Sequence, residues 1–594
     1  MIALLIASIG IATAQTLTVT GTVVSESDGQ PVVGAYVLVN GTTLGTITND
    51  KGEFGIRNVP ADAKEIIVTF LGYSTASAPV QAQPVKVIMK EDINYLDETI
   101  VVAFGTSTKE AFTGSATVVS SDAIAKVQSS DVTRALEGRV AGVQMTSSSG
   151  RLGSSPTIRI RGFTSINAGN DPLYIVDGVP YSGDIDNINP ADIESMTVLK
   201  DAASNALYGA RGANGVIMIT TKKAKAGEAV VTVDAKWGMN SKALQEYDVI
   251  TNPAQYYEAH YTALRNYYSN AAGLSAMDAH LKASSVVAGS PKEGGLGYQV
   301  FTVPENQAFI GTNGKVNPAA TLGRLVTGPD GVEYWVAPDN WIDETYRKSL
   351  RQEYNVSVAG RSGNGSYLAS FGYLNNKGIV TGNDMYRYTA RLKADYQAKK
   401  WLKVGANMAY TNFNWNNSNA NEGSGGSTAN VFAFASSVAP IYPVYLRDAN
   451  KNIMLDSRGY KIHDYGEGAN AGLARPYLQG ANPLQEITLN KNNSEGNAFN
   501  MTGFAEVEFF DGFKFTFNVG TGIDETRSTS TKNPFYGQFV PNGGIVSKEH
   551  SRSQYINLQQ LLTYDKTFAG AHTISVLLGH ESYKSYGYDL GAYP

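Results

Sequence analysis

Apolar and polar side chains alternate along Met385–Ala398, and this period of two constrains the fold more than any other feature of the sequence. Aromatic and aliphatic residues occupy the even positions from Tyr386 to Tyr396, whereas charged and polar residues occupy the odd positions from Arg387 to Gln397. Because successive side chains of a β-strand point to opposite faces, the segment predicts a strand with one apolar and one polar face.

The same alternation recurs in eight further segments, of which the last two are weaker. They are 230–237, 353–360, 366–374, 401–411, 503–509, 513–519, 554–563 and 573–578. Tight turns follow the strands that end at 361, 398, 511 and about 566. The other connections, which are mostly long, are 241–352, 376–384, 413–496 and 525–552. A soluble sandwich would alternate too, but short turns on one side and long loops on the other are typical of an outer-membrane β-barrel.

Composition agrees with a membrane barrel and argues against several other functions. Charged residues make up only 17% of the chain, against about 25% in typical soluble domains. Beyond the extreme N-terminus there is no run of 18 apolar residues that could form a spanning helix. The absence of cysteine excludes thiol catalysis and thiolate metal sites, and the net charge of −5 argues against a nucleic-acid partner.

The sequence carries no enzyme or cofactor signature. None of the six histidines lies in an H-E-x-x-H motif, and His580-Glu581 stands alone. There is no G-x-S-x-G nucleophile motif. Gly209–Gly215 lacks both the Lys-Ser/Thr of a P-loop and the spacing of a dinucleotide-binding loop, so it predicts close backbone packing. We therefore expect no catalytic residues, no cofactor and no metal site.

Two segments precede the barrel pattern. Residues 1–14 end in Ala12-Thr13-Ala14 after an apolar core, which predicts a secretory signal, although no Lys or Arg precedes that core. Residues 15–92 contain short strand candidates separated by turns such as Asn40-Gly41, the pattern of a small β-sandwich. The candidates are 17–25, 35–40, 44–48, 53–57, 66–71 and 85–90.

Residues 110–226 predict a mixed α/β domain. One helix is expected near Ser130, which could cap it, and Asp177-Gly178 is expected as a type I′ turn between two strands. The remaining expectations are a helix face formed by Val132, Ala135, Leu136 and Val140, a helix starting at Asn189-Pro190, a short helix from Asp201 to Leu207 closed by Gly209, and a strand at Val216–Thr221.

The size of this middle domain constrains the barrel. A domain of over a hundred residues has a radius of gyration of about 13 Å. It cannot fit a barrel of about eight strands, but it fits one of about 22 strands, the plugged class. Nine strands are also an odd number, whereas bacterial single-chain barrels use even numbers. We therefore expect that the chain is an N-terminal portion lacking roughly a dozen strands.

Several motifs resemble one family of proteins. The stretch GTVVSESDGQPVVGAYVLVNGTTLGTITNDKGEFGIRNVP resembles a carboxypeptidase-regulatory-like, transthyretin-type domain. Ala135–Met145 (ALEGRVAGVQM), Thr157–Asn167 (TIRIRGFTSIN), Asp171–Tyr181 (DPLYIVDGVPY) and Ile188–Lys222 resemble the plug of a TonB-dependent receptor. More specifically, they resemble the SusC/RagA group of Bacteroidetes nutrient importers. The order of the segments matches too, so the resemblance covers essentially the whole chain.

The resemblance implies a mainly β fold. It consists of a transthyretin-like sandwich, an α/β plug and part of an antiparallel transmembrane barrel of the 22-stranded class. The expected boundaries are 1–14 for the signal, 15–92 for the sandwich, 97–107 for the TonB box and linker, 110–226 for the plug and 229–594 for the barrel. The expected location is the outer membrane of a Gram-negative cell.

The resemblance also implies sites for partners. The TonB box would comprise Glu98, Thr99, Ile100, Val101, Val102, Ala103 and Phe104. The family more often has Val-Val-Val-Gly-Tyr-Gly there, but the changes keep strand propensity. We expect this strand to be left unpaired, so that the periplasmic C-terminal domain of TonB can add to it by β-augmentation.

The plug motifs supply the other candidate residues. They are Arg159, Arg161, Gly162, Asp177, Gly178, Lys200, Asp201, Tyr208, Gly209, Arg211 and Gly212. The three arginines could pair with barrel carboxylates such as Glu506 and Glu508. Solvated charge in the lumen is an equally weighted alternative.

The function that the resemblance implies is TonB-dependent import of an oligosaccharide or peptide across the outer membrane. The implied partners are TonB, a SusD-like surface lipoprotein and membrane lipid. A receptor that senses ligand and signals to a periplasmic anti-sigma partner is the main alternative. A secreted adhesin is a third possibility.

Overall fold

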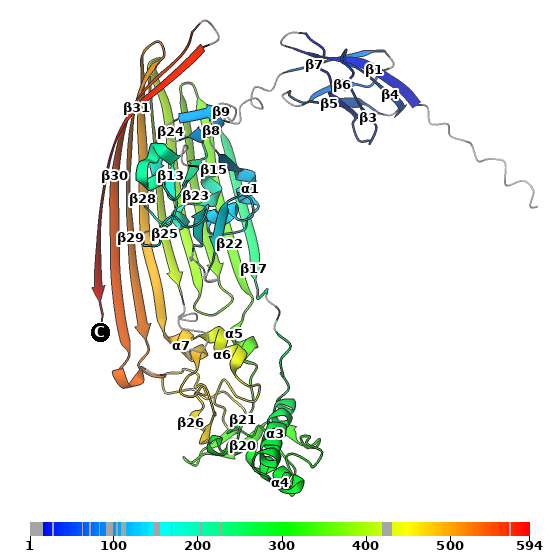
Figure 1. Cartoon of the computed structure of the whole chain (residues 1–594), viewed down its shortest axis with the longest axis vertical. Coiled ribbons are helices and arrows are strands. Elements are labelled where there is room, and N and C mark those ends of the chain that lie inside the picture. Colours follow the sequence, from blue (N-terminus) through cyan, green and yellow to red (C-terminus); the bar gives the residue numbers. More distant parts are fainter. Residues whose placement is uncertain are drawn as a thin grey trace, which may run out of the picture. The chain divides into compact units, whose positions relative to one another are not determined.

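The structure is a computed structural model in which the chain forms two compact units, Met1–Gly114 and Ser115–Pro594 (Figure 1). The described residues are 16–26, 29–61, 63–70, 73–81, 83–90, 99–102, 105–108, 115–147, 152, 155–167, 169–201, 205–224, 229–243, 245, 247–417, 430–537, 539–568 and 572–593. The expected signal segment lies outside them.

The first unit contains the predicted β-sandwich. One sheet places β1 (Thr16–Ser25) between β4 (Glu53–Pro60) and β7 (Val85–Met89). The second sheet has the order β3 (Gly45–Ile47), β2 (Tyr36–Val39), β5 (Glu65–Thr69) and β6 (Ala76–Pro79). Alternate residues of both sheets share one buried core that includes Val19, Val37, Phe54, Ile66 and Val87. The prediction missed β6, because Ala, Ser and Pro have weak strand propensity.

The segment expected to be the TonB box forms a hairpin. β8 (Thr99–Val102) pairs antiparallel with β9 (Gly105–Thr108). The expectation that this strand is left unpaired was therefore wrong, because the chain that follows it folds back and satisfies one edge of its backbone. Glu98, Ala103 and Phe104 lie outside the described residues.

The second unit begins with a five-stranded sheet. Its order is β10 (Ala116–Ser120), β15 (Ile193–Leu199), β16 (Val216–Thr221), β13 (Leu173–Val176) and β14 (Val179–Pro180). Around it lie the hairpin of β11 (Val143–Thr146) and β12 (Thr157–Ile160), helix α1 (Ser121–Ala125) and the 3-10 segments η1 (Val132–Leu136), η2 (Ile185–Asn187), η3 (Pro190–Asp192) and η4 (Ala206–Gly212). Residues from the sheet, the β11–β12 hairpin, α1, η1 and η2 form one apolar core.

The helices of this domain are shorter than predicted. The expected helix near Ser130 is the five-residue η1, and its cap is Asp131, whose carboxylate accepts the Thr133 N–H. The expected apolar face is nevertheless buried: Val132, Ala135, Leu136 and Val140. Asn189 caps the three-residue η3 as predicted. Residues 202–204, where the helix capped by Asp201 was expected, lie outside the described part of the chain.

All nine predicted barrel strands occur in one antiparallel sheet (Figure 1). In spatial order they are β17 (Val230–Asn240), β22 (Ser349–Ser362), β23 (Gly365–Lys377), β24 (Asp384–Lys399), β25 (Leu402–Asn416), β28 (Lys491–Phe510), β29 (Phe513–Lys532), β30 (Ile545–Phe568) and β31 (His572–Ala592). The strands extend beyond the predicted segments. The alternation fades at the ends of the strands that adjoin the long connections. In β30, polar residues such as Lys548 and Arg552 lie at that end, on the face that is apolar toward the other end of the strand.

The two faces of the sheet have the predicted character. In β24, Arg387 and Arg391 are 4% and 5% exposed, whereas their neighbours Tyr388 and Leu392 are 41% and 60% exposed. The polar face is therefore the covered one, and the apolar face is open. This arrangement is that of a barrel whose outside contacts lipid.

The long connections contain structure that the sequence pattern did not predict. They fold into α3 (Pro253–Asn270), α4 (Ala276–Val286), α5 (Trp341–Thr345), α6 (Val431–Ser437), α7 (Pro483–Leu489), η5 (Pro291–Glu293), η7 (Val540–Asn542) and the short strands β18 (Phe301–Thr302), β19 (Thr321–Leu322), β20 (Arg324–Thr327), β21 (Glu333–Val336), β26 (Glu467–Asn470) and β27 (Leu473–Ala474). Two apolar cores, one containing Tyr257 and the other Trp341, lie among these elements. No helix in the described residues is both long enough and apolar enough to cross a membrane.

Candidate functional site

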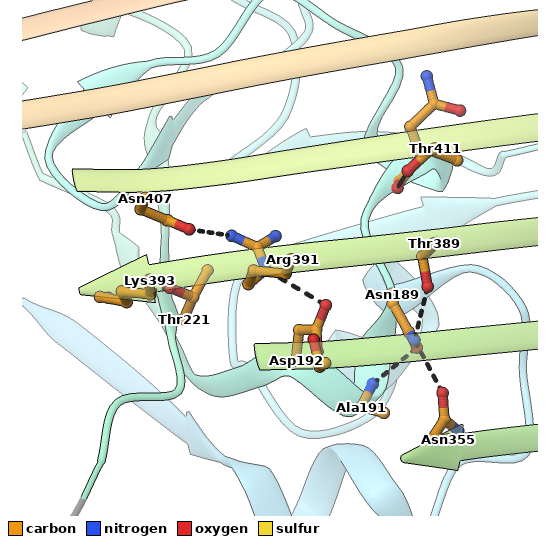
Figure 2. Close-up of polar contacts among 12 residues, drawn as sticks. Asn189, Ala191, Asp192, Thr221, Asn355, Thr389, Arg391, Lys393, Asn407 and Thr411 are labelled. Carbon is orange, nitrogen blue, oxygen red and sulfur yellow. Dashed lines mark hydrogen bonds and ion pairs between the residues drawn. The ribbon is translucent and has the colours of Figure 1, made fainter. Parts of the chain in front are cut away.

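The candidate site is the contact between the 177–221 part of the plug and the inward face of the nine-stranded sheet (Figure 2). Polar side chains from β22, β23, β24 and β25 reach plug residues in and between η2 and η3. Each contact joins residues more than 160 positions apart in the sequence, so the site exists only in the folded domain.

Asn189 is the first contact. Its Oδ1 accepts the Ala191 N–H at 3.0 Å, which caps η3. Its Nδ2 donates to Asn355 Oδ1 at 2.8 Å and to Thr389 Oγ1 at 3.1 Å (Figure 2). A glycine makes room for this amide, because a Cβ at Gly372 would lie 2.3 Å from Asn189 Nδ2. One side chain thus shapes the plug loop and joins it to two barrel strands.

Asp192 forms a buried ion pair with the wall. Its Oδ2 accepts from Arg391 Nε at 3.2 Å, and its Oδ1 accepts from Ser370 Oγ at 2.7 Å. Arg391 also donates to Asn407 Oδ1 at 3.0 Å. Both charged side chains are more than nine-tenths buried. Removing one partner of such a pair leaves an uncompensated buried charge, so the pair ties the plug strongly to β24.

Asp177 combines a turn with a wall contact. Asp177 and Gly178 both have positive φ, at 47° and 84°, which confirms the predicted I′-type turn. The Asp177 carboxylate accepts from Thr221 N and Oγ1 and from Asn407 Nδ2 at 2.6–2.9 Å, and Lys393 Nζ lies 3.5 Å away. Burial alone would raise the pKa of Asp177, but Lys393 and the Thr221 hydrogen bonds hold it below its ordinary value.

Arg387 holds two plug segments together. Its Nη1 donates to Ser130 O at 3.1 Å and to Asp186 O. The side chains of Asp131 and Asp186 are both buried here, and each keeps one carboxylate oxygen without a hydrogen-bond partner among the described atoms. Burial, and then the neighbouring Asp131 and Asp184, raise the pKa of Asp186 to about 8. The described residues contain no group of three or more His, Cys, Asp or Glu side chains that could hold a metal ion.

Contacts continue across the later strands. Thr411 Oγ1 donates to Asn187 O at 2.7 Å, and Asn187 Nδ2 donates to Asp524 Oδ1 at 3.1 Å. Val179 packs against Gly520, where a Cβ would lie 2.3 Å from Val179 Cγ1. The plug is therefore anchored from β22 to β31, the last anchor being Arg211.

The three plug arginines have different partners from those expected. Arg211 does pair with a barrel carboxylate, but with Glu581 at 2.6 Å. Arg159 pairs with Asp171 of the plug at 2.7 Å. Arg161 is exposed and has φ of 59°. The pairing with Glu506 and Glu508 was wrong, because both lie near the short turn at 511–512, and Lys403 on the adjacent strand is the ion-pair partner of Glu506 at 3.7 Å.

The remaining motif residues have structural roles within the plug. Lys200 N–H donates to Ser115 O, and Lys200 Nζ donates to Thr117 Oγ1. The Asp201 carboxylate accepts the Ser115 N–H. Gly162 and Gly209 have positive φ, Tyr208 is buried, and Gly212 lies close to the Asn205 backbone. Together, Lys200 and Asp201 secure the start of the plug.

Sequence reasoning missed most of the plug side of this site. Asn189 and Asp192 lie in a motif that was recognised, and Asn187 directly precedes it, but nothing in their spacing indicated that they face the wall. The wall side was partly visible, because alternation placed Arg387, Thr389, Arg391 and Lys393 on the polar face of β24.

Two family models match the chain. Residues 108–216 match the TonB-dependent Receptor Plug Domain, and residues 19–101 match the CarboxypepD_reg-like domain. These matches agree with the plug and with the N-terminal sandwich described above.

Curated relatives match almost the whole chain. It is 29% identical to the TonB-dependent receptor SusC of Bacteroides thetaiotaomicron over 590 residues, covering 96% of this chain and 50% of SusC. It is 28% identical to the TonB-dependent receptor P39 of Formosa agariphila over 564 residues, covering 94% of this chain and 46% of P39. The chain thus spans about half the length of the curated relatives it matches.

Solved structures show the same fold. A chain of the RagAB peptide importer in its open-open state gives a TM-score of 0.63 at 23% identity, covering 84% of this chain and 50% of that one. The closed-closed state gives 0.60 at 24% identity, covering 81% and 48%. These findings confirm the resemblance to SusC/RagA-type TonB-dependent receptors and the fold class that the sequence predicted.

Substituting Gly372 with alanine should loosen the plug. The new Cβ would displace the Asn189 amide from its two wall partners, at a cost of about 1–3 kcal/mol. Thermal unfolding of the full-length protein in detergent micelles would measure this loss of stability. Gly238→Ala is the matched control, because a Cβ there meets nothing within 4 Å. Equal effects of the two substitutions would contradict the role given to Gly372.

The plug should become less stable as the pH rises toward 8. The raised pKa of Asp186 means that its neutral form stabilises the fold; this contribution is complete below about pH 4 and is lost as the pH rises to about 8. The thermal stability of Asp186→Asn relative to that of the natural protein should therefore increase as the pH rises from 5 to 8.5.

Asp177→Asn serves as the control for this pH series. The pKa of Asp177 lies below its ordinary value, so its titration falls below pH 5 and its effect should be constant over the same range. An Asp186→Asn difference that does not grow with pH would show that Asp186 is ionised in the folded plug.

Proposed function

We propose that the complete protein imports an oligomeric nutrient, a glycan or a peptide, across the outer membrane in a TonB-dependent manner. The observation that carries this proposal is the plug, which matches a known receptor domain and is fastened to the polar, inward face of the sheet by hydrogen bonds and ion pairs. A domain fastened there obstructs passage until something detaches it. Import in this form needs no covalent chemistry, and we propose that the protein is not an enzyme.

The relatives support the choice of transported class. SusC and P39 are TonB-dependent receptors, and RagAB is a peptide importer. By analogy, we propose a SusD-like surface lipoprotein as the partner at the loop side and an outer-membrane location. Residues 1–14 would be the secretory signal and 97–107 the TonB box with its linker.

The hairpin changes how TonB would bind. β8 pairs with β9 along one edge, and no other described strand pairs with β8. TonB could add a strand to the open edge of β8, or it could replace β9. In both cases the backbone of Thr99–Val102 supplies the contact.

Replacing Val102 with proline should abolish uptake. Proline removes a backbone N–H and weakens strand pairing, so capture by the purified C-terminal domain of TonB should fail, whereas the plug should stay folded. Capture is measured by pull-down with the full-length protein. Uptake is measured as growth on single glycans or peptides that a deletion strain cannot use.

Thr106→Pro is the matched control. It disrupts the same hairpin from β9 but leaves Thr99–Val102 intact, so TonB capture should persist. Normal uptake by the Val102→Pro protein would show that this segment is not the TonB box.

A further inference from the structure

The first fifteen residues of the second unit are attached differently from the rest of the plug. Among the described residues, every hydrogen bond of Ser115–Ser129 has its partner inside the plug. Among the described strands, β10 lies at an edge of its sheet and pairs only with β15. The side chains of Val119 and Ile124 pack into the plug core. No described contact of this kind fastens the segment to the wall.

Wall contacts start at the next residue. Arg387 of β24 donates to Ser130 O and at the same time to Asp186 O. Further along the chain, wall side chains bind Asp177, Asn187, Asn189, Asp192, Arg211 and Thr221. The plug is thus divided at Ser130 into a segment held only by other plug residues and a body held by the barrel.

We propose that Ser115–Ser129 is a detachable segment that TonB peels from the plug, and that Arg387 at Ser130 is the stop at which peeling ends. This inference rests on the proposed function, because it takes TonB as the source of the tension. The TonB box precedes Ser115 in the chain, so tension arrives at Ser115 first.

The order of rupture follows from the contacts. Ser115 is held by the Lys200 and Asp201 contacts, and Thr117 by the Lys200 amine. Once they break, the β10–β15 ladder is loaded at Ala116–Leu199 and can open one pair at a time toward Ser120–Ser195. Beyond α1 the chain reaches Ser130, where Arg387 is itself buried in the wall and joined to a second plug segment. Further extension then requires breaking a barrel contact.

Single-molecule pulling tests this proposal. The full-length protein in lipid bilayers is pulled through the bound C-terminal domain of TonB. The first extension should be about 50 Å, the length of residues 115–129 at ~3.4 Å per residue. In Arg387→Ala it should grow toward about 200 Å, because the next wall contact among the described residues is at Asp177. Arg391→Ala, which removes a contact of Asp192, should leave the first extension at about 50 Å.

Disulfides give a second measurement that does not remove a buried charge. The chain has no cysteine, so introduced pairs are unambiguous. Ser120→Cys with Ser195→Cys would join β10 to β15, whose residues are paired at that position. Ser195→Cys with Thr220→Cys would join β15 to β16 within the anchored body. When oxidised, the first pair should shorten the first extension, and the second pair should leave it unchanged.

The outcomes separate the two hypotheses. A first extension of unchanged length in both Arg387→Ala and the oxidised Ser120–Ser195 pair would overturn the detachable segment. Release of the whole plug in one step would overturn it too. Failure of TonB to bind would instead contradict the proposed function. In that case, a DNA handle on Glu110→Cys applies the same tension without TonB, and the expected lengths are unchanged.

Discussion

The structure depends on hydrogen-bond and ion-pair partners for the polar side chains on the inward face of the nine-stranded sheet. A buried arginine or aspartate without a partner is strongly destabilising, and β24 alone places Arg387 and Arg391 on its covered face. The plug supplies the partners, namely the Ser130 and Asp186 carbonyl oxygens and the Asp192 carboxylate. The plug and the sheet therefore supply each other with the partners that their buried polar groups need.

Glycine determines how closely the two parts approach. Gly372 leaves space for the Asn189 amide, and Gly520 leaves space for Val179. Neither glycine has the positive φ that usually explains why a position requires glycine. Their role is the absence of a side chain, which lets hydrogen-bonding groups of the plug reach strands that would otherwise hold them away.

The contacts that hold the plug change along the chain: those at its start are made within the plug, and those to the barrel wall come later. Residues at the start of the plug are held by the plug's own Lys200 and Asp201, whereas the described contacts with the wall begin at Ser130. A domain of this kind can respond to tension in steps. The family motif around Lys200 thus serves the attachment of the plug's first strand, a role that no charge pattern in the sequence indicated.

The sequence by itself determined the nine long strands of the large sheet and their faces, because a period of two fixes which side chains share a face whatever the partner. It also identified the Asp177-Gly178 turn, whose chemistry is local. Tertiary structure alone decided which groups meet. Arg211 reaches Glu581 rather than Glu506 or Glu508, and Asp131 rather than Ser130 caps η1. Such pairings depend on the stagger of the strands and on small spaces such as that at Gly372, and a pattern read along one chain contains neither.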